Sequence, residues 1–542
     1  MKIRKILTMA LAALLALSCV CAFAFNETGY PICDETITVT LSAPTPGANL
    51  DWSEFALITE LEKRLGIRLE CTPYNAEAWD TQLTLMLASD TLPDVIIDTS
   101  MSLAEVSELG SQGFFLPLND LIEQYAPNIQ AMMEKYPDLR TYSTSADGNM
   151  YTVVGVREST IDTALRGWIN RVWLENLGLE YPTSVEEFKE VLIAFRDQDA
   201  NGNGDPSDEI PLSNFTSNLQ TLLLQSFGIP SGNAFYLLQA VDGKVVLGET
   251  TENYKAYLQY MRSLWEEDLL DHDNFIQTSD EFHAKASEDR VGAFYDAAPF
   301  VAAGRALDYD QNFYWLGALT SEFSPERTAY LNSHVIPTPY FLLNAKTQYG
   351  AEIVRMIDYF FSEEGKLAGK YGYEGMNYDM VYLDIPGLED KGILKVRQPE
   401  GYSSTEDYRN NAVTPGDFFA PYLAAEGTYH AAAMEADAGQ LEALLPLYGW
   451  GILVMRDCLS NPQVTKGSVF PTLLYTEEEV AERTSLYTDI SLYLETMHAQ
   501  FITGVADIEN DWENFLQTLD AMQLPRLLEI EQAAYDRLMG EE

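Results

Sequence analysis

The side chains of this 542-residue chain that are best suited to chemistry lie between Asp197 and Glu209, where the sequence reads DQDANGNGDPSDE. Oxygen-bearing side chains recur at every second position of its first nine residues, and Gly202 and Gly204 let the backbone coil tightly between them. Hard cations such as Ca²⁺ are held by about six to eight oxygens of carboxylates, amides and backbone carbonyls. Since no His or Cys lies near this loop, zinc and redox metals are not expected. The loop therefore predicts a structural calcium site.

Two registers of metal ligands fit this loop. In an EF-hand register the ligands at positions one, three and five are Asp197, Asp199 and Asn201. Gly202 takes the sharp-turn position, and Asp208 closes the loop at a position where Glu is usual. A second register begins two residues later. Its ligands would be Asp199, Asn201, Asn203, a backbone carbonyl near Asp205, Asp208 and Glu209. The alternative to both registers is a solvated turn rich in Asn and Gly.

No familiar catalytic motif accompanies the loop. The chain has no Gly-x-Ser-x-Gly elbow, no His-Glu-x-x-His and no phosphate-binding loop, and its five histidines are scattered without ligand spacing. A pair of carboxylates for glycoside hydrolysis, which would lie about 5–10 Å apart in the fold, is the alternative that the 83 acidic residues offer.

The elements that position the N-terminal half of the chain alternate between strand and helix patterns, which predicts α/β lobes. The expected series is a strand at 36–42, a helix at 53–65 ended by Gly66, a strand at 67–71, a helix at 79–88 and a strand at 94–98. This order predicts a mainly parallel sheet with right-handed crossovers.

The calcium loop follows directly on a further predicted helix. Thr183 or Ser184 caps this helix, which runs to about Phe195, and a strand is expected earlier at 151–154. Later helices are predicted at 252–267, 350–361, 477–501, 511–522 and 527–539.

The N-terminus has the pattern of an export signal. Lys2, Arg4 and Lys5 precede an apolar stretch at 6–20, and Ala22-Phe23-Ala24 is a small-x-small cleavage site. Cleavage after Ala24 is expected, although Ala16-Leu17-Ser18-Cys19 loosely resembles a bacterial lipobox, so a lipid anchor at Cys19 is the alternative. No later apolar run reaches the roughly 18 residues that span a bilayer.

Charge and length exclude several classes of partner and fold. The formal charge is −50, or about −53 without the three basic signal residues, so nucleic acid and anionic membrane surfaces are poor partners. The chain is too long for one hydrophobic core, which predicts two or more lobes.

Beyond the signal the cysteines are Cys33, Cys71 and Cys458, an odd and widely spaced set that forms no disulfide framework.

Several segments, in this order, resemble the extracellular solute-binding proteins of bacterial ABC importers. The resemblance is to the large, sugar-binding family 1 type, which includes alginate-oligosaccharide-binding and LipO-like members. The segments are FNETGYPI at 25–32, ASDTLPDV at 88–95, WLENLGL at 173–179, the loop at 199–212, Tyr373-Glu374-Gly375, FITG at 501–504, Trp512 and 532–537. They span almost the whole chain after the signal.

This resemblance implies a periplasmic-binding-protein-like fold of the class II type. Two hinge-linked lobes, each a mainly parallel sheet flanked by helices, would hold the ligand in the cleft between them, and extra helices would follow at the C-terminus. The expected division is a signal peptide at 1–24, lobe 1 at 25–153 with a return segment at 316–345, and lobe 2 at 156–315 and 346–542. In similar proteins the loop binds Ca²⁺ through an Asp-x-Asn-x-Asn pattern, which implies the register that begins at Asp199. This chain has one extra residue before the Asp208-Glu209 pair.

Candidate ligand residues stand where strands end or helices begin. Sugars present apolar faces that stack on aromatic rings and hydroxyls that need hydrogen-bond partners. The candidates are Trp52, Trp79, Asp98, Ser100, Trp168, Asp296, Tyr373, Glu374 and Trp450. For each of them, packing in the core or on the surface is the alternative.

The leading hypothesis is a secreted, non-enzymatic and monomeric binding protein that captures an oligosaccharide and delivers it to the permease subunits of an ABC transporter. It would carry structural Ca²⁺ and meet the membrane only through the transporter or a lipid anchor. The alternatives are a secreted carbohydrate-active lyase or hydrolase, and a sensor for a membrane signalling system.

Overall fold

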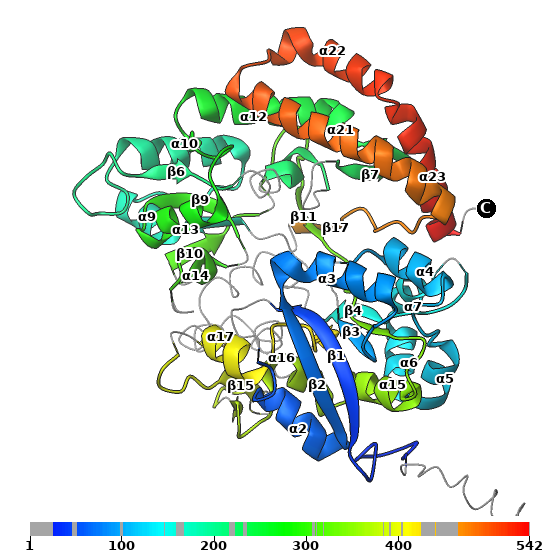
Figure 1. Cartoon of the computed structure of the whole chain (residues 1–542). Coiled ribbons are helices and arrows are strands. Elements are labelled where there is room, and N and C mark those ends of the chain that lie inside the picture. The colour runs from blue at the N-terminus through cyan, green and yellow to red at the C-terminus, as the bar shows by residue number, and fades with distance from the viewer. Residues whose placement is uncertain are drawn as a thin grey trace, which may run out of the picture. The chain divides into compact units, whose positions relative to one another are not determined.

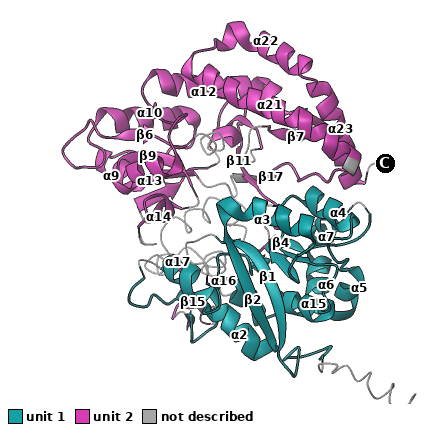
Figure 2. Ribbon diagram, viewed as in Figure 1, with its two compact units in different colours: residues 1–156, 337–379, 395–423 teal, residues 157–336, 380–394, 424–542 magenta. Residues whose placement is uncertain are grey.

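The computed structural model describes residues 25–45, 51–97, 101–145, 147–158, 167–215, 223–230, 236–296, 298–305, 309, 312–317, 319–382, 384–387, 389, 392–402, 405–423, 440 and 464–540. The predicted signal segment with Cys19 lies outside these residues, as do Asp98, Ser100, Trp450 and Cys458. The chain divides into two compact units (Figure 2). Unit 1 comprises residues 1–156, 337–379 and 395–423, and unit 2 comprises residues 157–336, 380–394 and 424–542.

The chain passes from unit 1 to unit 2 after Val156 and returns after Ile336. The expected division differs at three segments: residues 316–336, expected in the return segment of lobe 1, belong to unit 2, whereas residues 346–379 and then 395–423, expected in lobe 2, belong to unit 1. Strand β13 (Phe341–Leu343) accounts for the second difference, since it pairs with a unit 1 strand and carries the following helices with it.

The main sheet of unit 1 has the strand order β13-β3-β1-β2, and its strands β1 and β2 lie side by side in Figure 1. Strand β1 (Ile37–Thr45) pairs in parallel with β2 (Ile67–Asn75) and with β3 (Val95–Ile97), and β13 is antiparallel to β3. A second sheet has the order β12-β4-β16, from Val335–Pro339, Val154–Arg157 and Tyr422–Leu423. The predicted β-α-β-α-β series is therefore present, with an antiparallel strand added at the edge.

The helices of unit 1 begin and end at recognisable signals. Helix α2 (Ala56–Leu65) ends at Gly66, whose φ is 71°, and helix α3 (Ala76–Ser89) begins at Asn75, whose side chain accepts a hydrogen bond from the amide of Glu77. The remaining helices are α4 (Leu103–Ser111), α5 (Asn119–Tyr125), α6 (Pro127–Lys135), α7 (Pro137–Ser143), α15 (Gly350–Tyr359), α16 (Gly365–Tyr371) and α17 (Thr405–Tyr408). Strands β14 (Tyr378–Tyr382) and β15 (Gly392–Val396) form a two-stranded sheet.

The main sheet of unit 2 is mixed rather than mainly parallel. Its order is β10-β5-β9-β6, from Phe313–Trp315, Gly167–Asn170, Val291–Tyr295 and Ile210–Leu212. Strand β9 is parallel to β6 but antiparallel to β5, and β5 is antiparallel to β10. Two smaller two-stranded sheets pair β7 (Leu238–Val241) with β8 (Lys244–Leu247) and β11 (Arg327–Leu331) with β17 (Val464–Ser468).

Helices pack around the sheets of unit 2 and close its core. The predicted helices are present as α10 (Val185–Asp197), α12 (Glu252–Glu266), α21 (Glu477–Thr503), α22 (Ile508–Ala521) and α23 (Leu524–Met539). Unit 2 also contains α9 (Arg171–Leu177), α13 (Ser279–Ser287) and α14 (Pro299–Ala302). One hydrophobic cluster joins α10, α12 and the three C-terminal helices through buried residues such as Phe188, Tyr257, Leu494, Phe515 and Leu527. The C-terminal helices are thus part of the core of unit 2.

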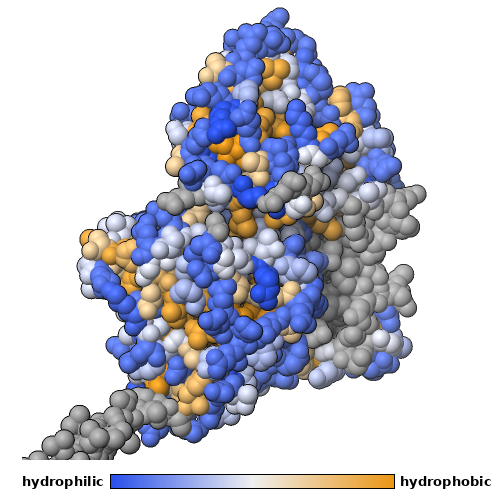
Figure 3. All heavy atoms as spheres, turned by 90° about the vertical axis from the view of Figure 1, so that its right-hand side faces the viewer, coloured by the Kyte–Doolittle hydropathy of each residue, from blue (hydrophilic) through white to orange (hydrophobic). Residues whose placement is uncertain are grey.

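Hydrophilic residues are spread over the face of the molecule shown in Figure 3, with apolar residues between them. Among the residues that the structure describes, no helix combines the length and the apolar character needed to cross a bilayer. Cys33 and Cys71 are free thiols, and burial raises the pKa of Cys33 to about 11 and that of Cys71 to about 12.

Candidate functional site

The predicted calcium loop connects helix α10 to strand β6. Ser184 caps α10 by accepting a hydrogen bond from the amide of Glu187, and the helix ends at Asp197. The loop then coils back, with a φ of 75° at Gly202 and of 93° at Gly204, a region in which glycine carries no steric cost. Local sequence signals alone therefore place the oxygen-rich residues in one tight turn.

The side chains of this loop converge on Asp208 and Glu209. The amide groups of Asn201 and Asn203 donate to the two carboxylate oxygens of Asp208 over 3.2 and 2.9 Å. Glu209 Oε1 accepts from the backbone amides of Ala200 and Asn201 over 2.9 and 3.3 Å. Burial raises the pKa of Glu209, although these backbone amides oppose the rise.

Two buried oxygens of the loop lack a hydrogen-bond partner among the described residues. They are Asp199 Oδ1 and Glu209 Oε2. A buried carboxylate oxygen without a partner is costly unless a donor or a cation compensates it. Within the described part of the chain, no group of three or more carboxylates, thiolates or imidazoles surrounds a common point, so a metal here would also need the amide and carbonyl oxygens of the loop.

The two remaining acids of the loop, Asp197 and Asp205, differ from Asp199 and Glu209 because neighbouring residues satisfy their carboxylates. Asp197 binds Arg196 Nε over 2.7 Å, and Asp205 Oδ1 accepts hydrogen bonds from the amide and the hydroxyl of Ser207. These hydrogen bonds lower the pKa of both carboxyl groups, and both residues are exposed to solvent.

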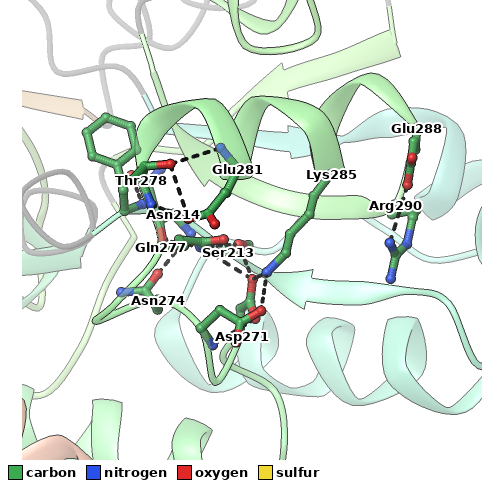
Figure 4. Close-up of polar contacts among 12 residues, drawn as sticks. Ser213, Asn214, Asp271, Asn274, Gln277, Thr278, Glu281, Lys285, Glu288 and Arg290 are labelled. Atoms are coloured by element: carbon green, nitrogen blue, oxygen red, sulfur yellow. Dashed lines mark hydrogen bonds and ion pairs between the residues drawn. The ribbon is translucent and has the colours of Figure 1, made fainter.

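A second polar cluster occupies the carboxyl end of strand β6 (Figure 4). Ser213 Oγ donates to Asp271 Oδ2 over 2.6 Å, and Lys285 of α13 donates to the same oxygen over 2.7 Å. Gln277 Nε2 donates to the carbonyl of Asn214 over 2.6 Å, and Asn214 Nδ2 donates to the carbonyl of Tyr295 at the end of β9. These contacts lock the ends of two neighbouring parallel strands to helix α13.

Two predicted ligand residues meet at the carboxyl end of β9. Trp168 Nε1, on β5, donates to the backbone carbonyl of Asp296 over 2.9 Å, and Asp296 Oδ2 lies 3.0 Å from His283 Nε2. The Trp168 ring is 1% exposed. His283 was not singled out from the sequence, because its partner lies 13 residues away beyond the end of a helix.

The predicted tryptophans of unit 1 are covered by protein. The ring of Trp52 stacks on Phe418 at a centroid distance of 6.2 Å, and Trp79 packs against Tyr74 at 6.0 Å. They are 1% and 2% exposed. Both residues therefore serve the packing of unit 1 in this structure.

Tyr373 and Glu374 lie at the C-terminal end of helix α16. The Tyr373 ring is buried beneath the guanidinium group of Arg64, whose Cζ lies 4.2 Å from the ring centroid, whereas Glu374 is exposed. Burial raises the pKa of Tyr373 to about 12. The described candidates therefore form one group in unit 2, Trp168 with Asp296, and separate positions in unit 1.

Comparisons with known proteins give long matches at low identity. No protein-family model matches the chain. The chain is 23% identical over 517 residues to the fructooligosaccharide ABC transporter substrate-binding protein FusA of Streptococcus pneumoniae serotype 4, covering 94% of this chain and 91% of FusA. It is 22% identical to the lipoprotein LipO of Bacillus subtilis, covering 74% of this chain and 79% of LipO.

Solved structures match over the same length. An EF-hand mutant of FusA in complex with fructo-nystose has a TM-score of 0.73 at 20% identity, covering 93% of this chain and all of that one. The alginate-binding protein AlgQ2 without calcium ion has a TM-score of 0.68 at 20% identity, covering 95% and 99%. The expected periplasmic-binding-protein-like α/β fold is thereby confirmed.

Proposed function

We propose that this chain, a solute-binding protein of the kind that serves ABC transporters, captures an oligosaccharide outside the cell and delivers it to the membrane subunits of an importer. The observation that carries the proposal is the match over 94% of the chain to a substrate-binding protein of a fructooligosaccharide transporter. Two of the proteins found by sequence comparison are binding proteins by name, which agrees with the expectation that this chain is not an enzyme.

We propose as ligand residues the candidates that were expected from the sequence. Asp296 has the strongest support, because it lies at the carboxyl edge of a sheet, where ligands of α/β proteins bind, and the buried Trp168 holds its backbone there. The further candidates are Trp52, Trp79, Asp98, Ser100, Tyr373, Glu374 and Trp450. The crossings after Val156 and Ile336 are proposed as parts of the hinge between two lobes.

Isothermal titration with a panel of fructo-, gluco-, manno- and galacto-oligosaccharides tests this function. We expect one class to bind in a one-to-one complex and to raise the melting temperature, because a ligand that binds only the folded state stabilises it. The same mixtures, analysed by chromatography after long incubation, should contain the glycan unchanged. Cleaved products would instead support a carbohydrate-active enzyme.

We also propose a structural Ca²⁺ held by Asp199, Asn201, Asn203, the carbonyl of Asp205, Asp208 and Glu209. The buried, unpartnered oxygens of Asp199 and Glu209 support this set, since a cation would satisfy both. Of the related proteins, FusA has been solved as an EF-hand mutant and AlgQ2 without calcium ion. The ion would neutralise the acids of the loop and brace the connection between α10 and β6.

The proposed location is the outer side of the cell membrane. A named relative is a lipoprotein, and the N-terminal pattern supports either release after Ala24 or a lipid anchor at Cys19. Mass spectrometry of the protein secreted by a bacterial host separates the two, because a diacylated N-terminal cysteine adds a mass that simple cleavage does not. A monomer is expected by size-exclusion chromatography.

A further inference from the structure

Helix α13 lies against the carboxyl ends of strands β6 and β9, which end side by side at one edge of the unit 2 sheet. The two strands are parallel neighbours with Leu212 opposite Ala293, so the residues that follow them, Phe215 and Asp296, emerge at adjacent places beyond the sheet edge. This edge is where α/β folds place their ligands. The edge therefore brings an aromatic ring and a carboxylate into one neighbourhood.

The aromatic side of this neighbourhood is Phe215. Its half-buried ring packs against Phe282 of α13 at a centroid distance of 6.0 Å. The amide of Phe215 donates to Asn214 Oδ1, and Asn214 is fully buried and bound to the carbonyl of Tyr295. An aromatic ring fixed in this way, with part of its surface still in solvent, can take the apolar face of a sugar.

The polar side is the carboxylate of Asp296. Its side chain is 13% exposed and lies 3.0 Å from His283 Nε2, and its backbone carbonyl accepts from Trp168 Nε1. His283 follows directly on Phe282, and their rings lie 5.5 Å apart. One turn of α13 therefore positions both the aromatic ring and the acid.

A partly buried ion pair anchors that turn. Lys285 contacts Asp271 over 2.7 Å and Asp273 over 2.9 Å. Burial alone would raise the pKa of Asp271, but the hydrogen bonds from Lys285 and Ser213 outweigh burial and leave the pKa below its usual value. The pair therefore stays charged at neutral pH and ties α13 to the end of β6.

We propose that Phe215 and Asp296, with His283 as the positioning residue of the carboxylate, form a subsite for one uncharged sugar unit of the oligosaccharide. This inference rests on the proposed function and narrows its substrate class. The ring takes the C–H face of the sugar, and the carboxylate accepts hydrogen bonds from its hydroxyls. A uronate is excluded because its own carboxylate would face Asp296 in a chain of net charge −50.

Isothermal titration of the full chain without its signal tests the subsite. The wild type is titrated with neutral fructo-, gluco-, manno- and galacto-oligosaccharides and with an oligogalacturonate. We expect a neutral glycan to bind and the oligogalacturonate not to bind. For the glycan that binds, Asp296→Asn should raise Kd by about tenfold or more and Phe215→Leu by roughly threefold to tenfold.

The role of His283 is tested by a pair of variants. His283→Ala should raise Kd about threefold to tenfold, whereas His283→Gln, which can still donate to Asp296, should restore Kd to within about twofold of the wild type. If His283 only filled space in the fold, His283→Gln would not bind the glycan more tightly than His283→Ala. The matched controls are His272→Ala, since His272 pairs with Asp268 over 3.2 Å elsewhere on unit 2, and Phe323→Leu. Neither should change Kd, and circular dichroism melts verify that each variant folds.

The outcomes distinguish a failure of the proposed subsite from a failure of the proposed function. If no oligosaccharide binds the wild type, both proposals are wrong. If the oligogalacturonate alone binds, or if the Phe215, His283 and Asp296 variants bind a neutral glycan as tightly as the wild type and the controls, the protein still binds oligosaccharides but the subsite is wrong.

Discussion

Glu249 is a carboxylic acid that unit 2 buries completely. Its two oxygens accept hydrogen bonds from the backbone amides of Tyr236 and Leu237 over 2.6 to 3.0 Å, and Tyr236 is held at a φ of 93°, which is unusual for an aromatic residue. Burial raises the pKa of Glu249 to about 7, although these amides oppose the rise. A buried acid of this kind links the stability of unit 2 to pH.

The sign of this linkage follows from the two pKa values. The carboxyl titrates at about 4.5 in the unfolded chain and at about 7 in the folded one, so between these values the folded state binds the proton more tightly. Its stabilising contribution is fully present below pH 4.5 and is lost as the pH rises through 7. A shift of this size corresponds to about 3 kcal/mol.

We therefore expect Glu249→Gln to remove a pH-dependent part of stability. The melting temperature of the wild type relative to the variant should fall between pH 4.5 and 8, because only the wild type loses the contribution of the protonated acid. Differential scanning calorimetry of both proteins at half-unit steps of pH measures this difference. A constant difference across the range would mean that Glu249 does not titrate in the folded state.

Element ends give a second group of predictions, beginning with Gly66 at the end of α2. Its φ is 71°, and a Cβ atom added there would lie 2.1 Å from the backbone carbonyl oxygen of Cys33. Gly113, just beyond α4 in the same unit, has a φ of 85° and open space around its Cα. Both glycines therefore need a left-handed backbone conformation, but only at Gly66 would an added Cβ atom meet neighbouring atoms.

Gly113→Ala should cost about 1–2 kcal/mol of stability, the price of a left-handed conformation for an L residue. Gly66→Ala should cost roughly 1–3 kcal/mol more, since the chain near Cys33 must also move. Thermal unfolding of both variants measures the costs. Equal losses would show that the end of α2 adapts without strain.

The loop between α10 and β6 gives a prediction that decides between the two calcium registers. EDTA should lower the melting temperature of the wild type, since an ion at about one hundred times its Kd contributes about 2.7 kcal/mol. Asp199→Asn and Glu209→Gln should remove most of this response, because these residues carry the buried, unpartnered oxygens. Asp197→Asn should keep the response, because Asp197 is bound to Arg196.

Asp205→Asn is the matched control, since only its backbone carbonyl belongs to the proposed ligand set. Loss of the response in Asp197→Asn together with its retention in Glu209→Gln would favour the EF-hand register, because Asp199 is a ligand in both registers. A wild-type melting temperature that EDTA leaves unchanged, with calcium previously in excess, would contradict the metal proposal as a whole.

At the scale of the molecule, the dominant electrostatic feature is the net charge of −50. Self-repulsion of this charge opposes the compact state, and salt screens it with a Debye length of about 10 Å at 0.1 M. Local ion pairs such as Arg526–Glu482 and Arg526–Glu529 are exposed and contribute little each. The total charge is therefore expected to govern the response to salt.

We expect the melting temperature to rise as NaCl increases from 10 to about 500 mM in the presence of EDTA, because screening weakens the self-repulsion. EDTA separates this effect from ion binding in the loop. Choline chloride at the same ionic strength should give a similar rise, since screening does not depend on the chemical nature of the cation. A fall with salt would mean that attractive ion pairs outweigh the repulsion.

Much of this molecule could be predicted from the sequence wherever the determinants are local. The helix that Ser184 caps, the stop at Gly66 and the C-terminal helices depend on neighbours within a few residues, and they are present close to the predicted bounds. The oxygen-rich loop belongs to the same class, because alternate side chains of a tight turn necessarily face one another. The resemblance to solute-binding proteins over almost the whole chain predicted the two-lobed fold.

Contacts between distant parts of the chain were decided only by the tertiary structure. The pairing of β13 with β3 joins residues more than 240 positions apart and brings 346–379 into unit 1. The burial of Trp52 against Phe418 and the grouping of Phe215, His283 and Asp296 also follow from packing. Residue types and spacing determined what each segment could form, whereas the packing of strands and helices against one another determined which side chains meet, because that packing minimises the exposed apolar surface of the whole chain.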